Sequence, residues 1–449
     1  MKILWICNTM LPIIAHKLGL GAGNKEGWLT GLCSTILENH TKNNIELHIA
    51  FPTDNASGIK SGQLHLENGA VLTYYAFTEE IHKPEKYRPF LEKQLADIIN
   101  EAEPEVIHCF GTEFPHTLAA IKACSTPEKI VVGLQGICTA IAESYMANIP
   151  ESVQNSVTFR DFIKRDSIKQ QQRKYAIRGL REQEVISRAV NVIGRTKFDR
   201  GYAYKYNQGL TYYSMNETLR TCFYQGKWSE ESSKPHTIFI SQADYPLKGF
   251  HYLLIAAGRL VKKYPDIEIR AAGNSLVEYA ALKDKMKISA YGKYLRRLIR
   301  DEGLEGRVHF TGMLSAEQMK EEYLNCGVFV CCSANENSPN SLGEAMLLGV
   351  PCVAALVGGI PDMFTAGVDG AGFKGFDADL RPDMTAYDGG LYNVSEALEK
   401  AVCEIWENPS KKHTFCKNAR IHAKTTHNRE ANYAKMVEIY SNIAERARK

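Results

Sequence analysis

The 449-residue sequence contains no apolar run of the roughly 18 to 20 residues that a membrane-spanning helix needs. The short apolar stretch in MKILWICNTMLP is followed by no small-residue cleavage site, so it does not resemble a secretory signal peptide. The 12 cysteines include no C-x-x-C pair, and several lie in apolar, strand-like runs. We therefore interpret them as buried thiols of a cytoplasmic protein and expect no disulfide framework.

A large charge imbalance is also absent, because the net charge is only +3. A value this small gives no reason to expect nucleic acid as a partner. The composition, with 44% hydrophobic and 23% charged residues, is typical of globular proteins. A chain of this length exceeds a single hydrophobic core and indicates two or three domains.

Short apolar runs alternate with longer helical patterns along the chain, which is typical of α/β domains with parallel sheets. The first series of expected strands is 2–8, 45–51, 71–77, 105–111, 129–136 and 191–196. The second series is 236–242, 266–273, 307–312, 327–333 and 350–357. Two such series predict two Rossmann-like, doubly wound domains.

The segment 210–235 lacks clean periodicity and ends in polar residues and a proline, so we place the domain boundary there. The predicted domains are 1–214 and 215–426, with a helix at about 427–449 that packs back on the first domain. Ligands of such sheets bind beyond the carboxyl ends of the strands. The cleft between two lobes is therefore the expected site.

The stretch ENSPNSLGEAMLLGVP places two carboxylates, Glu336 and Glu344, eight residues apart. The pattern predicts a loop after a strand, then a helix that begins at Ser338 or Ser341 and stops at Gly349. One interpretation is a capping box, with Glu344 bonding back to the Ser341 N–H. The other is a ligand site, because a helix N-terminus binds anions and carboxylates accept sugar hydroxyls.

The same stretch resembles the E-x7-E signature of glycosyltransferase family 4, whose members are retaining enzymes with the GT-B fold. The segments YPLKGFHYLLIAAGRL and GGIPDMF resemble the flanking motifs of that family. The resemblance covers most of residues 236–375. The matching positions within the signature are Glu336, Pro339, Asn340, Leu342, Glu344, Ala345, Met346, Gly349, Pro351, Val353 and Ala354.

The resemblance implies a GT-B fold, with two Rossmann-like domains facing across a cleft, and a nucleotide-sugar donor, either UDP- or GDP-linked. It implies that Lys248 contacts the diphosphate, Glu344 the ribose hydroxyls and Glu336 the donor sugar. The donor is also expected to contact the backbone at Asn337, Ser338, Asn340, Ser341 and Leu342. We expect no metal and no further cofactor, since no Asp-x-Asp motif stands out.

Two positions depart from the family pattern. Ala243, beside Gln242, stands where the family usually has an arginine that shares the diphosphate, and Arg195 is a candidate substitute. Phe110 stands where a histidine is common near the transferred sugar, and His108 keeps only the strand-end position. In the following loop, Glu113 and His116 are candidates for that catalytic role, although loop residues of these types more often cap helices.

Glycines cluster in LGLGAGNKEGWLTGL, residues 18–32, where Gly21 and Gly23 would let a loop approach a ligand closely. We expect a helix from about Lys25 and a donor-side contact. The segment is neither a G-x-G-x-x-G fingerprint nor a P-loop, so a plain surface loop stays an alternative.

Residues 159–184 carry eight Lys and Arg interleaved with apolar residues. This predicts one basic amphipathic helix, either packed on its domain or lying on anionic lipid near a lipid-linked acceptor. The stretches GTEFPH and NETLR resemble bacterial polysaccharide-biosynthesis members of the family, which favours a capsule, exopolysaccharide or similar glycan as the product, with a glycan or lipid-linked acceptor as partner. Two alternatives stay open: a nucleotide-sugar epimerase, and a non-catalytic nucleotide-sugar or membrane-binding scaffold.

Overall fold

The computed structural model describes residues 1–20, 27–54, 61–277, 286–376 and 386–448. Gly21, Gly23 and the helix start expected at Lys25 lie outside these ranges. The chain forms two compact units. Unit 1 comprises Met1–Thr139, Tyr175–Arg220 and Thr426–Lys449, and unit 2 comprises Ala140–Lys174 and Thr221–Thr425.

Unit 1 contains an eight-stranded sheet of order β3-β4-β2-β1-β5-β6-β7-β8. Its strands are β1 (Lys2–Ile6), β2 (Glu46–Thr53), β3 (Gly62–His65), β4 (Val71–Thr78), β5 (Val106–Phe110), β6 (Ile130–Gly133), β7 (Asn191–Gly194) and β8 (Thr211–Ser214). All neighbours are parallel except the β3–β4 pair. The central strands β1 and β5 are almost wholly buried, as apolar strands covered on both faces should be.

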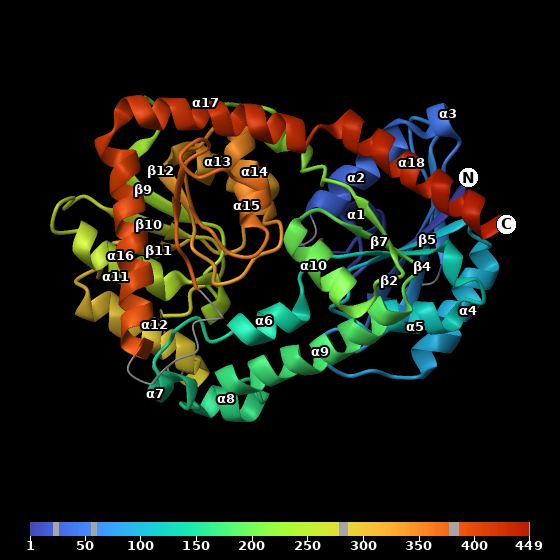
Figure 1. Ribbon diagram of the computed structural model, residues 1–449, viewed down its shortest axis with the longest axis horizontal. Coiled ribbons are helices and arrows are strands. Elements are labelled where there is room, and N and C mark those ends of the chain that lie inside the picture. The colour runs from blue at the N-terminus through green and yellow to red at the C-terminus, as the bar shows by residue number, and fades with distance from the viewer. Residues whose placement is uncertain (21–26, 55–60, 278–285, 377–385, 449) are drawn as a thin grey trace. The chain divides into compact units, whose positions relative to one another are not determined.

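The C-terminal helix α18 packs on the core of unit 1 and lies against α2 and β5 (Figure 1). Its Tyr440 hydroxyl accepts from the Trp5 indole at 3.0 Å and bonds His108 Nδ1 at 2.7 Å. The helices of this unit are α1 (Pro12–Lys17), α2 (Gly27–Glu38), α3 (His40–Asn43), α4 (Phe90–Ala102), α5 (Pro115–Ala123), α10 (Lys197–Tyr206) and α18 (Arg429–Arg448), with a 3-10 turn η2 (Pro127–Lys129). The two buried hydrogen bonds of Tyr440 fix α18 to the central strands β1 and β5.

Unit 2 contains a six-stranded parallel sheet of order β11-β10-β9-β12-β13-β14. Its strands are β9 (Lys234–Ile240), β10 (Glu268–Ala271), β11 (Val308–Phe310), β12 (Cys326–Cys331), β13 (Cys352–Ala355) and β14 (Ala371–Phe373). Its helices are α7 (Glu151–Gln154), α8 (Phe159–Lys164), α11 (Phe250–Leu260), α12 (Ala290–Asp301), α13 (Ala316–Asn325), α14 (Asn340–Leu348), α15 (Ile360–Met363), α16 (Ala386–Glu407) and α17 (Pro409–Thr426), with 3-10 turns η3 (Thr221–Tyr224) and η4 (Pro246–Lys248). Helices α6 (Cys138–Ser144) and α9 (Ile168–Arg188) each run from one unit into the other. All eleven predicted strand runs contain an observed strand, so the predicted α/β class is confirmed.

The division between the units differs from the expected one in two respects. The chain passes from unit 1 to unit 2 after Arg220 instead of 214, and residues 140–174 group with unit 2. Contacts explain this grouping, because the Thr158 hydroxyl donates to the Ile288 carbonyl at 2.8 Å. The buried His251 likewise bonds the Ala147 carbonyl at 2.6 Å.

The expected single helix over 159–184 is wrong, because the structure has α8 and α9 with a break between them. A capping box formed by Thr158 and Asp161 starts α8, and Arg165, at φ 50°, ends it. Two of the cations, Arg178 and Arg181, are buried. The segment is therefore less basic at its surface than its sequence suggests.

None of the helices in the described ranges is long and apolar enough to cross a membrane.

Candidate functional site

The loops that follow β9 and β12, neighbours in the unit 2 sheet, are held together at its carboxyl edge. The Ala334 N–H donates to the Leu247 carbonyl at 2.7 Å. Gly249 has φ +69°, and a Cβ at this position would lie 1.9 Å from the Cys332 carbonyl oxygen. Only glycine permits this approach, which fixes the neighbouring Lys248 beside the second loop.

Lys248 and Glu336 form a partly buried ion pair between the two loops. The Lys248 ammonium lies 2.6 Å from Glu336 Oε1, and the two side chains are 18% and 15% exposed. The Ser333 hydroxyl donates to the same oxygen at 2.7 Å. Burial acts to lower the pKa of Lys248, but the Glu336 carboxylate and the Tyr245 phenol outweigh it and raise the pKa well above its usual range. Lys248 is therefore a permanent cation.

The backbone of Glu336 is fixed by the GGIP segment. The Gly359 N–H donates to the Glu336 carbonyl at 2.9 Å. Gly358 has φ +53°, and a Cβ there would lie 2.0 Å from that carbonyl oxygen. The two glycines thus place the carboxylate of Glu336 against Lys248.

Helix α14 begins at Asn340 with Pro339 as its N-cap, and no side chain caps this end. Of the two interpretations, the capping box formed by Ser341 and Glu344 is therefore wrong, since both residues lie inside the helix. The first amides of a helix have no partner within it, so an uncapped N-terminus can receive an anion. Asn340 Oδ1 is buried and has no hydrogen-bond partner among the described residues.

Glu344 is 3% exposed on α14. The Tyr323 hydroxyl donates to the Ser341 carbonyl at 3.0 Å and lies 3.5 Å from Glu344 Oε2. Asn337 and Leu342 are buried nearby in the chain, and the Ser338 hydroxyl lies 3.8 Å from Met363 Sδ. Unit 2 thus brings together the eight described residues expected to hold the donor. Their roles stay predictions.

The first departure from the family pattern concerns Ala243 and its candidate substitute, Arg195. Ala243 is 2% exposed in the core of unit 2. Arg195, the candidate substitute cation, belongs to unit 1, where its guanidinium lies 2.9 Å from Glu217 and donates to the Leu134 carbonyl at 3.0 Å. Arg195 is therefore already engaged by a buried carboxylate.

Phe110 and His108 are core residues of β5. Phe110 is 1% exposed and packs edge-on against Trp5, with ring centroids 4.9 Å apart. Burial, followed by the charge of Arg195, lowers the pKa of His108 to about 3, so this ring is neutral. Neither residue offers a polar group to a substrate.

Glu113 lies in the loop after β5, but His116, which was also expected in that loop, is the second residue of α5 in unit 1. Glu113 Oε1 accepts from the Gly136 N–H at 2.8 Å, while Oε2 is buried without a hydrogen-bond partner among the described residues. His116 is fully buried, with Nδ1 2.9 Å from Glu79 and Nε2 3.0 Å from Asn8 Oδ1. Both ring nitrogens are bonded within the protein, and a catalytic role for either residue stays a prediction.

Residues 224–380 match the family model for glycosyl transferases group 1. This region is a glycosyl transferases group 1 domain. It lies within unit 2 and contains Lys248, Glu336 and Glu344.

Curated proteins that are similar to part of this chain include D-inositol 3-phosphate glycosyltransferases. The protein from Corynebacterium urealyticum is 29% identical over 170 residues, which cover 37% of this chain and 38% of the relative. The protein from Corynebacterium kroppenstedtii is 30% identical over 137 residues, which cover 29% of this chain and 28% of the relative. The chain thus matches less than two fifths of the length of these relatives.

Solved structures match along almost the whole chain. Sucrose-phosphate synthase from Thermosynechococcus elongatus has a TM-score of 0.68 at 14% identity and covers 98% of both chains. HepE from Anabaena, solved with UDP-glucose, has a TM-score of 0.64 at 18% identity and covers 98% of this chain and 100% of its own. The chain therefore has the GT-B fold, with two Rossmann-like domains.

Sequence reasoning missed three residues around the site in the group 1 domain. Ser333 bonds Glu336, Tyr323 contacts Glu344, and the Tyr245 ring lies 5.9 Å from the Lys248 ammonium. The serine at the strand end was the one available signal, because polar residues at that edge contact ligands. No group of three or more His, Cys, Asp or Glu in the described ranges is placed to hold a metal ion.

Proposed function

We propose that this protein is a glycosyltransferase that moves a sugar from a nucleotide diphosphate donor to a hydroxyl acceptor with retention at the anomeric carbon. The observation that carries the proposal is the Lys248–Glu336 pair next to the uncapped N-terminus of α14, with the buried Glu344 in the same helix. A fixed cation beside open helix amides suits a diphosphate. Two carboxylates suit the hydroxyls of ribose and sugar.

In the proposed reaction, Lys248 and the first amides of α14 stabilise the negative charge that develops on the departing diphosphate. The Glu336 carboxylate accepts a hydrogen bond from a hydroxyl of the donor sugar, and Glu344 accepts hydrogen bonds from the ribose hydroxyls. Because Lys248 and the helix supply the positive charge, we propose that the transfer needs no metal ion and continues in EDTA.

The neighbours support a UDP-sugar and a glycan acceptor. HepE was solved with UDP, with UDP and glucose, and with UDP-glucose. TarM from S. aureus, with a TM-score of 0.58 at 12% identity, was solved with UDP, α-GlcNAc-glycerol and fondaparinux. These ligands favour UDP over GDP and agree with a role in bacterial polysaccharide or glycoconjugate synthesis.

The surface of α8 favours a lipid-linked acceptor at an anionic membrane. Its Phe159, Phe162 and Ile163 side chains are 62%, 71% and 63% exposed. Lys164 and Arg165 are exposed beside them. Apolar side chains bordered by cations are typical of helices that lie on anionic lipid.

Co-sedimentation with vesicles tests this membrane contact. The wild-type chain should bind vesicles that contain phosphatidylglycerol better than vesicles of phosphatidylcholine alone, and Phe162→Glu should abolish the difference. Phe90→Glu on α4 alters a comparably placed residue, 49% exposed, and should leave binding unchanged. Equal binding of Phe162→Glu and wild type would exclude α8 as the contact.

The catalytic proposal is tested by incubating the protein with UDP- and GDP-sugars and a panel of glycan and lipid-linked acceptors. Lys248→Ala and Glu336→Ala should each abolish transfer. Lys293→Ala and Glu305→Ala, which alter exposed residues of unit 2, should retain it. NMR of the product's anomeric proton should show the donor configuration.

Three results would contradict the proposal. Interconversion of the donor sugar without an acceptor would indicate an epimerase. UDP binding without any turnover would favour a scaffold. Full transfer by Glu336→Ala would show that the site lies elsewhere.

A further inference from the structure

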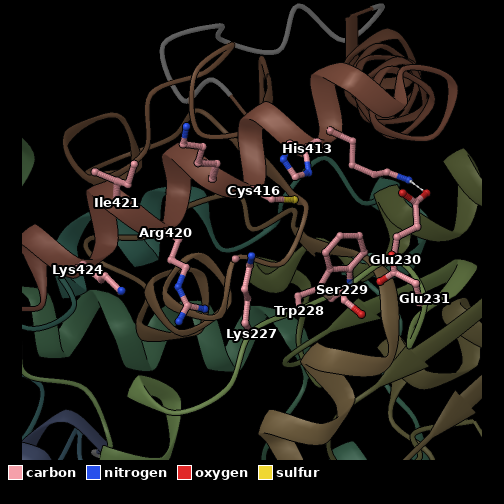
Figure 2. A pocket seen from close by; sticks show the side chains of 13 residues that line it. Lys227, Trp228, Ser229, Glu230, Glu231, His413, Cys416, Arg420, Ile421 and Lys424 are labelled. Carbon is pink, nitrogen blue, oxygen red and sulfur yellow. Dashed lines mark hydrogen bonds and ion pairs between the residues drawn. The ribbon is translucent and has the colours of Figure 1, made fainter.

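Unit 2 contains a pocket of about 600 Å³ that is separate from the candidate donor site. Its walls come from the segment 227–231 and from α17, and Gly349 forms part of its lining. Figure 2 shows Cys416, Arg420 and Lys424 of α17 together with Lys227 and Trp228 of the other segment. Gly349 ends α14, whose first residue is Asn340. With a rise of about 1.5 Å per residue, the pocket and the donor site lie about 13 Å apart along this helix.

Cations dominate the lining of this pocket, which has five Lys or Arg against two Glu. Lys412 is paired with Glu230. Among the described residues, no ion pair joins Lys227, Lys417 or Lys424 to a carboxylate. All three lysines line the same pocket, so their positive charge would attract an anion that binds there.

Arg420 contributes a fourth cation whose position is fixed. Its guanidinium donates to the Gly226 carbonyl at 2.9 Å and to the Leu348 carbonyl at 3.3 Å. The second bond covers a carbonyl at the C-terminal end of α14, where the helix dipole would otherwise oppose an anion. Arg420 thereby offsets the unfavourable end of the helix.

The pocket also has an apolar wall. Trp228 is held in place, because its indole N–H donates to the Cys326 carbonyl at 2.9 Å and its backbone N–H to the Leu348 carbonyl at 2.9 Å. Cys416 and Ile421 of α17 add apolar surface. Burial raises the pKa of the Cys416 thiol to about 12, so it stays neutral. Apolar walls with a few converging polar groups are typical of small-molecule sites of this size.

We propose that this pocket is a second ligand site, which binds a small phosphate ester with a flat apolar group. The phosphate contacts Lys227, Lys417 and Lys424, and the flat group packs against Trp228. The assignment is independent of the proposed transferase activity, because the pocket shares no residue with the candidate donor site.

Phenyl phosphate is a suitable probe, because it combines one phosphate with one flat ring. The chain has 4 tryptophans, so 5-fluorotryptophan labelling gives four fluorine resonances, which Trp→Phe variants assign. Phenyl phosphate should shift the Trp228 resonance saturably and leave those of Trp5 and Trp406 unchanged. Inorganic phosphate and benzyl alcohol should each bind more weakly.

A charge-reversal variant separates the proposed contacts from general attraction. The double variant Lys417→Glu/Lys424→Glu should weaken phenyl phosphate binding about tenfold or more, since hydrogen bonds to charged groups are the strong ones. Lys293→Glu changes an exposed lysine of α12 and should bind as wild type. Unchanged thermal unfolding of the double variant confirms its fold.

Two results would overturn the proposal. One is a Trp228 resonance that does not move with millimolar phenyl phosphate. The other is equal affinity of the double variant and the wild type, which would place the probe outside this pocket. Both results concern binding alone, so the transferase assay can succeed or fail independently of them.

Discussion

Replacing Gly249 by alanine tests whether the close approach of two loops places Lys248. A suitable control exists in the same unit, because Gly303 has the same φ of +69° but nothing within 4 Å of an added Cβ. At Gly249 the added Cβ would lie 1.9 Å from the Cys332 carbonyl oxygen. Both variants place alanine at a positive φ, but only Gly249→Ala also brings its Cβ against the Cys332 carbonyl oxygen.

The structure gives the size of both effects. Alanine in the left-handed region costs about 1–2 kcal/mol at either position. Cβ contacts shorter than 3.0 Å essentially never occur, so the loops at Gly249 must separate by at least 1.1 Å, the difference between 3.0 and 1.9 Å. Such overpacking costs about 1–3 kcal/mol more. A displacement of about 1 Å next to reacting groups costs about a hundredfold in rate.

Thermal unfolding and steady-state kinetics measure the two consequences. Each kcal/mol changes Tm by about 2–4 °C in a unit of this size, so Gly249→Ala should melt about 2–12 °C below Gly303→Ala. Its kcat/KM should fall about a hundredfold, while Gly303→Ala keeps wild-type kinetics. Equal melting temperatures, or full activity of Gly249→Ala, would show that the loop contact does not position Lys248.

Three further changes have defined outcomes. Glu344→Gln should weaken UDP binding about 10- to 100-fold in calorimetry, because a hydrogen bond to a charged group is worth about 1.5–3 kcal/mol. Unchanged affinity would show that the Glu344 carboxylate does not contact the nucleotide. Burial lowers the pKa of His251 from 6.5 to about 4 despite its bond to the Ala147 carbonyl. The unfolded chain therefore binds this proton first, and up to about 3 kcal/mol of stability is lost as the pH falls from 6.5 towards 4. His251→Gln should lessen that acid sensitivity of Tm, and an identical pH profile would contradict it. The bond to Asp369 raises the pKa of His422. The ion pair of His422 with Asp369 therefore contributes its full stability below pH 6.5, and this stability is lost as the pH rises through the raised pKa of His422. The Tm difference between wild type and His422→Gln should accordingly shrink at alkaline pH.

The strands were predictable where both faces are buried. The strand runs found from sequence are mostly apolar on successive residues, as in β1 and β12, whose residues are almost all buried. Three described strands were missed, and all are short or exposed: β3 (Gly62–His65) has one buried residue, β8 (Thr211–Ser214) has none, and β14 (Ala371–Phe373) is only three residues long. Edge strands of this kind carry too few apolar residues to give a pattern.

Two helix predictions were wrong because the residues that cap the helix ends differ from those expected. In α14 the chain turns helical directly after Pro339, so Ser341 lies inside the helix and cannot cap it. In α8 the residues Thr158 and Asp161 form a capping box, which starts a separate short helix within the stretch predicted to be one helix. The candidate donor residues were predictable because a continuous motif carries them. The glycine contacts were not, because each joins segments far apart in the chain.

The ion pair between Lys248 and Glu336 sets a condition on the proposed donor binding. Without a donor, the pair holds both side chains at the site, since each is the other's partner at 2.6 Å. A diphosphate must take over part of the Lys248 contact, and its negative charge then replaces that of Glu336 in keeping the lysine protonated. Glu336 does not leave when this happens, because Ser333 bonds its carboxylate and Gly359 its carbonyl. The released carboxylate oxygen can then accept a hydroxyl of the sugar. Ala243 stands where the family resemblance implies a second cation, and we propose that this exchange lets Lys248 bind the phosphate while Glu336 binds the sugar.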